Sequence, residues 1–216
     1  APVAPLGAEA RTGDLSGLAV NPTFQRHLVL NLDVSGSMDT SIGDVQIALM
    51  ALKGLLGSAF GTTVLVSVVT FSSVAAVRFT HCRRRPTTPE LPMPEFDAMV
   101  SQLSAGGETN LSGGLECCYA LVAEVNEVNG RQLPTWLVTM SDGDANVGPY
   151  RTADRFAESV ARFKSQFAAT TITLGYGTAH RPDVLSVLGN YTHISTPEQI
   201  TGTVALCALE TLRAVA

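Results

Sequence analysis

The sequence predicts an α/β protein: a doubly wound, mostly parallel six-stranded sheet with one antiparallel edge strand and helices on both faces. Short apolar runs rich in β-branched residues alternate with segments whose apolar residues recur every three or four positions. Some of the runs are almost continuously apolar, as in strands that are buried on both faces of a parallel sheet. With 216 residues, 45% of them hydrophobic and 15% charged, the chain is able to bury the core of one such domain.

The first half of the chain is predicted to run strand, helix, strand, strand. The apolar run His27–Asp33 (HLVLNLD) is the first strand. An amphipathic helix follows, because apolar residues recur at helical spacing: Val45, Leu49, Leu52 and Leu56. The nearly continuous apolar run Thr63–Phe71 is a buried strand. Ala75–Phe79 comes so soon after it that the two strands are expected to pair antiparallel through a tight turn.

The second half alternates helices and strands more regularly. It begins with Thr80–Glu95, a predicted loop or extended connection that holds four of the eleven prolines. A helix over 111–125 is predicted from its apolar spacing, with Asn110 as the N-cap. A helix over 156–167 is supported by an expected ion pair between Glu158 and Arg162. The same patterns predict short helices over Phe96–Leu103 and Pro182–Leu188, strands over Thr135–Met140, Thr170–Leu174 and Tyr191–Ile194, and a closing helix over Pro197–Ala214.

Composition argues against several classes of protein. Fourteen Lys and Arg against nineteen Asp and Glu give a net charge of −5, which disfavours nonspecific binding to nucleic acid or anionic membranes. The 24 uncharged residues Gly54–Val77 include three glycines and seven hydroxyl residues, which favour a helix end and a strand over a membrane span. No signal peptide is visible at Ala1–Ala10. The adjacent Cys117 and Cys118 suit a reducing compartment, so a cytoplasmic location is slightly favoured over an extracellular one.

Oxygen-bearing side chains follow the predicted strands at the edge where such sheets bind ligands. Asp33, Ser35 and Ser37 stand at alternate positions directly after the first strand. Thr109 lies in the loop before a helix, and Asp142 closely follows another strand. A ligand set made only of oxygens selects a hard divalent cation such as Mg²⁺. Each fragment alone also fits an ordinary turn or helix cap, but together, at one edge of one sheet, they predict a metal site.

The chain resembles a von Willebrand factor type A domain, which has a Rossmann-like fold, and its motifs match that family's metal-ion-dependent adhesion site. The Asp-x-Ser-x-Ser element is Asp33, Ser35 and Ser37, the family's loop threonine is Thr109, and its aspartate after the fourth strand is Asp142. The resemblance implies that the serines and the threonine contact Mg²⁺, or Mn²⁺ or Ca²⁺ in its place, and that the aspartates often act through water. It also implies that the sixth position is left for an Asp or Glu carboxylate of a protein partner.

The match covers most of the chain, from His27 to about Leu209. Residues 1–26 are therefore expected to be an N-terminal extension, an added edge strand or an arm, and residues 27–216 the domain itself. Three segments look most like the bacterial and intracellular eukaryotic members of the family: Gly106–Leu115, Ser141–Gly148 and Gly175–His180. The expected state is a monomeric domain or a part of a larger assembly.

Binding rather than catalysis is predicted, because an enzyme would also need a base placed beside the metal. Asp144 or Glu108 could lie nearby, but the sequence does not place either of them as that base. One alternative is an aspartyl phosphotransferase of the haloacid-dehalogenase kind, which also places an Asp after its first strand. Its second carboxylate would stand where this chain has Ser35, and a hydroxyl cannot act as that acid or base. Another alternative is a scaffold domain of the same family whose metal site is inactive.

Overall fold

The computed structural model describes residues 24–56, 63–80, 93–176, 180–194, 199–200, 202–203 and 206. Their elements are, in chain order, β1 (Arg26–Asp33), the 3₁₀ turn η1 (Gly36–Met38), α1 (Ile42–Leu56), β2 (Val64–Phe71), β3 (Ala75–Thr80), α2 (Met93–Ser101), α3 (Leu111–Asn129), β4 (Thr135–Ser141), α4 (Ala153–Gln166), β5 (Ala169–Tyr176), α5 (Pro182–Leu188) and β6 (Asn190–Ile194).

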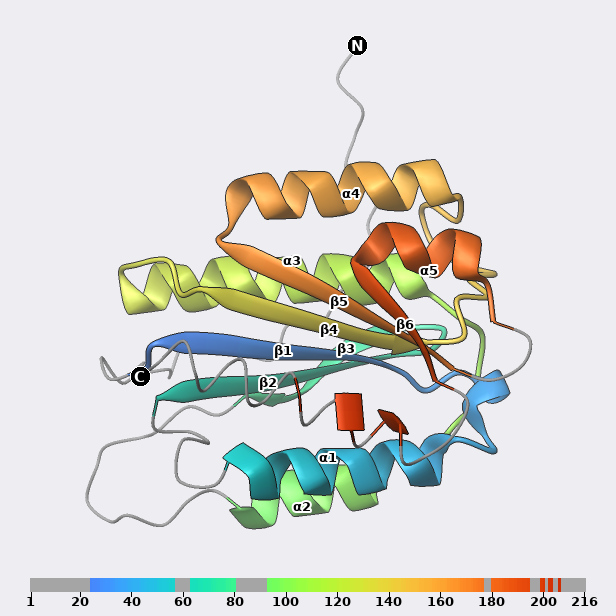
Figure 1. Cartoon of the computed structure of the whole chain (residues 1–216), viewed down its shortest axis with the longest axis horizontal. Helices are drawn as coiled ribbons and strands as arrows, with labels where there is room; N and C mark the ends of the chain where they lie inside the picture. Colours follow the sequence, from blue (N-terminus) through green and yellow to red (C-terminus); the bar gives the residue numbers. More distant parts are fainter. Residues whose placement is uncertain are drawn as a thin grey trace.

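The strands form one six-stranded sheet in the order β3-β2-β1-β4-β5-β6. All neighbours pair in parallel except β3, the edge strand, which is antiparallel to β2. Figure 1 shows α1 and α2 on one side of the sheet and α3, α4 and α5 on the other. The predicted fold class is therefore confirmed.

The strand β1 lies at the switch in strand order, because the chain adds β2 on one side of it and later β4 on the other. Asp33, its last residue, is in register with Phe71, the last residue of β2. On the other side Leu32 is in register with Met140, close to the end of β4. The carboxyl ends of these three strands consequently meet at one edge, which is where ligands bind in sheets of this kind.

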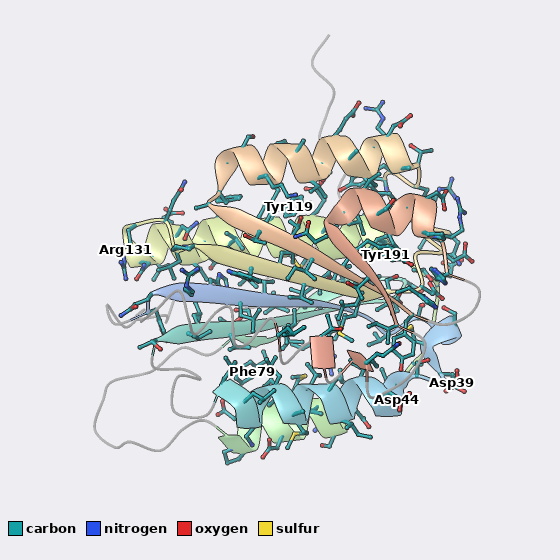
Figure 2. The ribbon with its side chains drawn as sticks, in the orientation of Figure 1. Asp39, Asp44, Phe79, Tyr119, Arg131 and Tyr191 are labelled. Atoms are coloured by element: carbon teal, nitrogen blue, oxygen red, sulfur yellow. The ribbon has the colours of Figure 1, made fainter. Side chains whose placement is uncertain are left out.

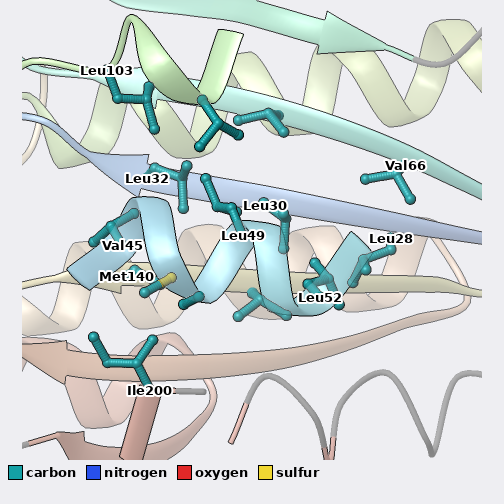
Figure 3. Close-up of a cluster of buried hydrophobic side chains, with 14 of the residues drawn as sticks. Leu28, Leu30, Leu32, Val45, Leu49, Leu52, Val66, Leu103, Met140 and Ile200 are labelled. Atoms are coloured by element: carbon teal, nitrogen blue, oxygen red, sulfur yellow. The ribbon is translucent and has the colours of Figure 1, made fainter. Parts of the chain in front are cut away.

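Two apolar clusters cover the two faces of the sheet, since successive side chains of a strand point to opposite faces. One cluster joins alternate residues of β1 to the buried face of α1 (Figure 3); its members include Leu28, Leu30, Leu32, Val45, Leu49 and Leu52. The other lies under α3, α4 and α5, and its members include Val29, Phe71, Leu115, Val122, Phe156, Phe163 and Leu185. The sheet is thus held between two layers of helices, and its faces are covered by them.

Two predicted details are wrong. The helix α2 begins at Met93, inside the predicted connection Thr80–Glu95. Pro94 did not prevent this because proline is tolerated in the first turn of a helix, where its missing N–H has no partner to bond. Glu158 does not pair with Arg162: it accepts a hydrogen bond from Arg155, while the Arg162 guanidinium reaches Glu116 on α3.

Some predicted elements lie partly outside the described residues. Of the closing helix Pro197–Ala214, positions 199, 200, 202, 203 and 206 are helical, and Ile200 is fully buried in the cluster on the α1 side. The extension 1–26 is described only from Phe24, which is buried in the cluster under α3. Within the described part of the chain, no helix combines the length and apolarity required to cross a membrane.

Candidate metal centre

Three loops meet at the carboxyl edge of β1 and β4, and backbone hydrogen bonds join them. The loop after β1 exchanges two bonds with the loop before α3: Gly36 N–H donates to the Gly107 carbonyl at 3.0 Å, and Gly106 N–H donates to the Val34 carbonyl at 2.8 Å. The loop after β4 is joined to the same segment, because Asn146 N–H donates to the Thr109 carbonyl at 3.2 Å. All five predicted site residues stand on these three loops or on the strand ends beside them.

Asp33 is the most deeply buried carboxylate of this edge, with 1% of its surface exposed. Its Oδ1 accepts a hydrogen bond from the Ser35 backbone N–H at 2.9 Å, and its Oδ2 accepts one from the Ser141 hydroxyl at 2.5 Å. Burial raises the pKa of Asp33 to about 6, against the opposing effect of these bonds, and the nearby charge of Asp142 raises it further. Such a carboxylate is stabilised by a positive charge placed beside it.

The hydroxyl groups of Ser35 and Ser37 lie side by side, with their oxygens 3.1 Å apart. Ser35 is buried, whereas Ser37 is exposed to solvent. The turn η1 begins between them, so the chain bends and brings two alternate side chains to one place. Two neutral oxygens are thereby brought together, and Ser35 also bonds to the Asp33 carboxylate. Figure 2 labels Asp39, which follows η1, at this end of the molecule.

Thr109 is buried, and its backbone is held by the loop that follows β4. Its N–H donates to the side-chain Oδ1 of Asn146 at 2.9 Å, and its carbonyl accepts from the N–H groups of Asn146 and Val147. The next residue, Asn110, is the N-cap of α3, as predicted, and its side chain accepts a bond from Gly113 N–H at 2.9 Å. Thr109 is thus fixed between a helix start and a clamping asparagine.

Asp142 is half-buried directly after β4. Its carbonyl accepts a hydrogen bond from Arg181 N–H at 2.7 Å, and its Oδ1 accepts one from Asp144 N–H at 3.1 Å. Its carboxylate is close enough to Asp33 to raise the pKa of that group. The predicted residues are therefore brought to one edge: Asp33, Ser35 and Ser37 are linked by hydrogen bonds, Asp142 acts on Asp33 through its charge, and Thr109 is tied to the Asp142 loop through Asn146.

Two glycines with positive φ lie at close contacts of these loops: Gly107 beside the turn between β2 and β3, and Gly148 beside the start of α3. Gly107 has φ of 80°, and a Cβ there would lie 2.8 Å from Ser73 Oγ. Gly148 has φ of 108°, and a Cβ there would lie 2.3 Å from both Asn110 Oδ1 and Ser112 Oγ. Since other residues rarely adopt this backbone conformation, glycine is needed to bring the loops together.

Asn146 contacts the candidate site residue Thr109, and the sequence pattern did not single it out. It appeared only inside the segment Ser141–Gly148, which was quoted for its resemblance. Its contacts with both backbone groups of Thr109 follow from the path of the loop after β4. The asparagine in that segment was the sequence feature from which this contact could have been predicted.

The side chains present fit a hard cation that is bound by oxygen. Three of the five groups are hydroxyls, the other two are carboxylates, and one of the carboxylates is buried. Across the part of the chain that the structure describes, no three His, Cys, Asp or Glu side chains form a group able to hold a metal ion. The candidate site does not require such a group, because serine and threonine oxygens would supply its remaining ligands. Cys117 and Cys118 are both buried and unbridged, and Cys82 and Cys207 lie outside the described residues.

Comparisons with known proteins agree with this fold. No protein-family model matches the chain, and no curated protein matches it. A solved structure described as von Willebrand factor type A from Catenulispora acidiphila matches with a TM-score of 0.64 and 17% identity, over 86% of this chain and 42% of that one. The pilus adhesin SpaC from Lactobacillus rhamnosus GG matches with a TM-score of 0.66 and 15% identity, over 89% of this chain and 30% of that one.

A third solved structure is described as containing a metal ion. Proximal thread matrix protein 1 from the mussel byssus, described as having a zinc-occupied metal-ion-dependent adhesion site motif, matches with a TM-score of 0.61 and 14% identity. The match covers 86% of this chain and 47% of that one. This chain therefore spans less than half the length of the three solved chains described here. At these identities the similarity establishes a shared fold.

Proposed function

We propose that this chain, which has the von Willebrand factor type A fold, is a module that binds a protein partner through a divalent metal ion. The observation that carries the proposal is the buried Asp33 carboxylate, oriented by Ser35 and Ser141 beside two serine hydroxyls and close to Asp142. A buried carboxylate with a second, half-buried carboxylate nearby is unfavourable without a compensating cation. The position of the group at the switch in strand order supports a ligand site.

The metal would be held by neutral oxygens from Ser35, Ser37 and Thr109, with Asp33 and Asp142 acting through water. When bound, the metal supplies a positive charge with an open coordination position. Mg²⁺ is the proposed ion because hard cations of small radius favour oxygen ligands, and Mn²⁺ and Ca²⁺ share that preference. The zinc-occupied motif of the mussel protein supports binding of a divalent ion at this place in the fold.

The open position would be filled by an Asp or Glu of the partner, because direct ligation by hydroxyls leaves the ion positively charged. We propose binding rather than catalysis. The neighbouring acids Glu108 and Asp144 are exposed to solvent, and the Asp144 backbone is engaged with Asp142. A general base must instead be held within hydrogen-bond reach of a reacting group.

A melting-temperature titration with Mg²⁺ and Mn²⁺ tests the metal site. An ion that binds only the folded protein, at a hundredfold excess over its Kd, stabilises it by about 2.7 kcal/mol. For a chain of this size that raises the Tm by roughly 5–10 °C. Asp142→Ala should lose the rise, whereas the matched variant Asp144→Ala, which removes an exposed carboxylate two residues later, should keep it. No rise in the wild-type protein, or an equal rise in Asp142→Ala, would contradict the proposal.

A second arm of this experiment tests the open position. Acetate should displace water from protein-bound Mn²⁺ and lower the relaxation rate of water protons, whereas uncharged acetamide at the same concentration should not. Equal effects of the two probes would show that the bound ion does not select a carboxylate. A protein that fails to bind metal at all would favour the scaffold alternative.

A further inference from the structure

The loop that joins β4 to α4 crosses the start of α3 and touches it repeatedly. Asn146 holds the backbone of Thr109 at 2.9 Å and 3.2 Å. At Gly148 the loop comes so near that a Cβ would overlap Asn110 and Ser112. Tyr150 then reaches Glu116, on the next part of α3. Every second residue of this stretch of the loop therefore meets α3 or the residues just before it.

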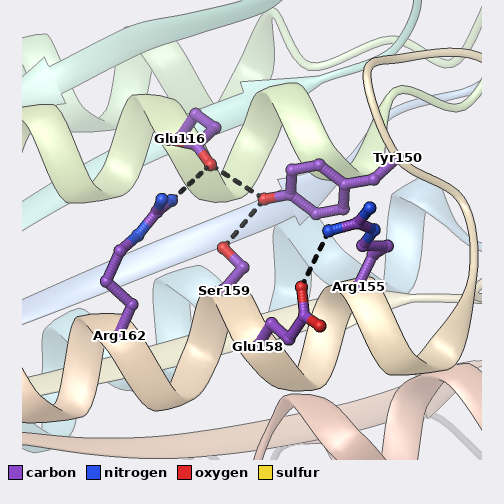
Figure 4. A network of polar contacts seen from close by, with 6 residues as sticks. All are labelled: Glu116, Tyr150, Arg155, Glu158, Ser159 and Arg162. Atoms are coloured by element: carbon purple, nitrogen blue, oxygen red, sulfur yellow. Dashed lines mark hydrogen bonds and ion pairs between the residues drawn. The ribbon is translucent and has the colours of Figure 1, made fainter. Parts of the chain in front are cut away.

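Tyr150 is the last of these contacts and the most fully surrounded. Its hydroxyl donates to Glu116 Oε1 at 3.0 Å and lies 2.9 Å from the Ser159 hydroxyl of α4 (Figure 4). Its ring packs edge-on against Phe156, with centroids 5.1 Å apart. Burial raises the pKa of Tyr150 above its ordinary value, so the hydroxyl keeps the proton that it donates. Glu116 also accepts a bond from Arg162 at 3.1 Å, which holds its carboxylate in place.

A hydrogen bond within the loop connects the segment around Tyr150 to the candidate site. The guanidinium of Arg151, the neighbour of Tyr150, donates to the Asn146 carbonyl at 2.8 Å. Asn146 in turn fixes Thr109, and Asp142 begins the same loop. The distance between Asp142 and Thr109 therefore depends on how firmly the loop is held against α3.

We propose that Tyr150 is a positioning residue for the candidate metal site, because its bond to Glu116 holds the β4–α4 loop against α3 and so sets the spacing of Asp142 and Thr109. This inference rests on the proposed function. Tyr150 is not itself a ligand, and it acts through Arg151 and Asn146. Residues behind the ligands of a metal typically change its affinity about 10- to 100-fold when they are replaced.

Two pairs of variants separate positioning from simple stabilisation. Tyr150→Phe removes the hydroxyl but leaves the Glu116–Arg162 bond between α3 and α4 available. Glu116→Gln keeps an oxygen that accepts the Tyr150 bond, whereas Glu116→Ala removes it. Tyr176→Phe is the matched control, because its hydroxyl also donates to a carboxylate, Asp44 Oδ2 at 2.9 Å, on the α1 side of the sheet.

Mn²⁺ affinity is measured from the electron paramagnetic resonance signal of the free ion. Tyr150→Phe and Glu116→Ala should bind Mn²⁺ about tenfold more weakly, the lower end of the expected range, while Glu116→Gln and Tyr176→Phe should stay near wild type. In the metal-free protein, the Asn146 and Val147 amides should exchange with solvent faster in Tyr150→Phe, since both donate to the Thr109 carbonyl.

The outcomes distinguish this inference from the function on which it rests. Normal Mn²⁺ binding by wild type together with unchanged affinity in Tyr150→Phe would overturn the positioning role alone, even if that variant melts at a lower temperature. Unchanged amide exchange at Asn146 and Val147 would also overturn it. A wild-type protein that binds no Mn²⁺ would overturn the proposed function and the positioning role together.

Discussion

Two ionisable side chains of β1, Asp33 and His27, are buried on the same face of the sheet, and their surroundings differ. Asp33, at the carboxyl end, receives two hydrogen bonds and has hydroxyl oxygens beside it. His27, near the other end, lies fully buried with Nε2 2.9 Å from the Ser67 hydroxyl. Burial lowers the pKa of His27 from 6.5 to about 3, so its imidazole is neutral in the folded protein. One end of β1 thus buries a hydrogen-bonded carboxylate, and the other end buries a neutral imidazole.

His27 makes stability depend on pH. Below pH 6.5 the unfolded chain binds a proton that the folded chain does not take up until about pH 3, so stability falls as pH falls through this window. The loss approaches about 1.4 kcal/mol per pH unit. Between pH 7.5 and 5, the stability advantage of wild type over His27→Gln should therefore shrink by roughly 2 kcal/mol, measured by urea denaturation.

Ser67→Ala is the control for this prediction. It removes the hydrogen-bond partner of His27 but keeps the buried imidazole, so it should lower stability at every pH and retain the wild-type slope. A difference between wild type and His27→Gln that stays constant with pH would show that folding does not exclude a proton from this group.

At the residue scale, the sequence was sufficient to predict that the candidate site residues meet at one edge, but not which residues hold them in place. Asp33, Ser35, Ser37, Thr109 and Asp142 follow predicted strands or precede a predicted helix, so strand order alone brings them to one edge. The role of Asn146 depends on the path of an irregular loop. No periodic pattern encodes such a path, and the sequence alone therefore did not reveal it.

At the scale of elements, helix α3 packs in close contact with the sheet at Gly114. A Cβ at Gly114 would lie 2.6 Å from Phe71 Cδ1 and 2.8 Å from Asn31 Oδ1. Thr109 precedes this contact in the chain and Glu116 follows it. The packing of α3 against the sheet therefore also positions the segment that carries Thr109. A larger residue at 114 would have to lift the helix or displace a buried side chain.

Gly114→Ala should destabilise the protein by about 1–3 kcal/mol through this overpacking, measured by chemical denaturation. The matched control is Gly54→Ala in α1, where a Cβ would meet nothing within 4 Å. There the usual helix preference for alanine should stabilise the protein by about 0.5–1 kcal/mol. Equal effects of the two substitutions on stability would contradict the close packing of α3 against the sheet.

Element types followed from periodicity, but element ends and side-chain partners did not. The spacing of apolar residues in α3 and its Asn110 cap was sufficient to predict that helix, which extends to Asn129 rather than 125. The start of α2 was missed because prolines suit both a connection and a first helical turn. Arg162 was paired wrongly because helical spacing does not show that Glu116 of another helix lies within reach.

At the scale of the whole molecule, the site draws on segments that are far apart in the chain. Ser141 and Asp33, which are bonded, are separated by 108 positions. β1 and β4 are paired although α1, β2, β3, α2 and α3 lie between them in the sequence. Alternation of strands and helices predicted this arrangement, since a doubly wound sheet adds strands on both sides of its first one.

This long separation has a consequence for folding kinetics. Closing so large a loop is entropically costly, so contacts between β1 and β4 are expected to form late, after the transition state. An ion held between their ends would then stabilise the native state without stabilising that transition state. In stopped-flow experiments, saturating Mg²⁺ should slow unfolding, by about a hundredfold for 2.7 kcal/mol, and leave the refolding rate nearly unchanged. Faster refolding with metal would instead indicate that β1 and β4 pair before the transition state. The effect of the ion on the two rates would therefore show at which stage of folding these strands pair.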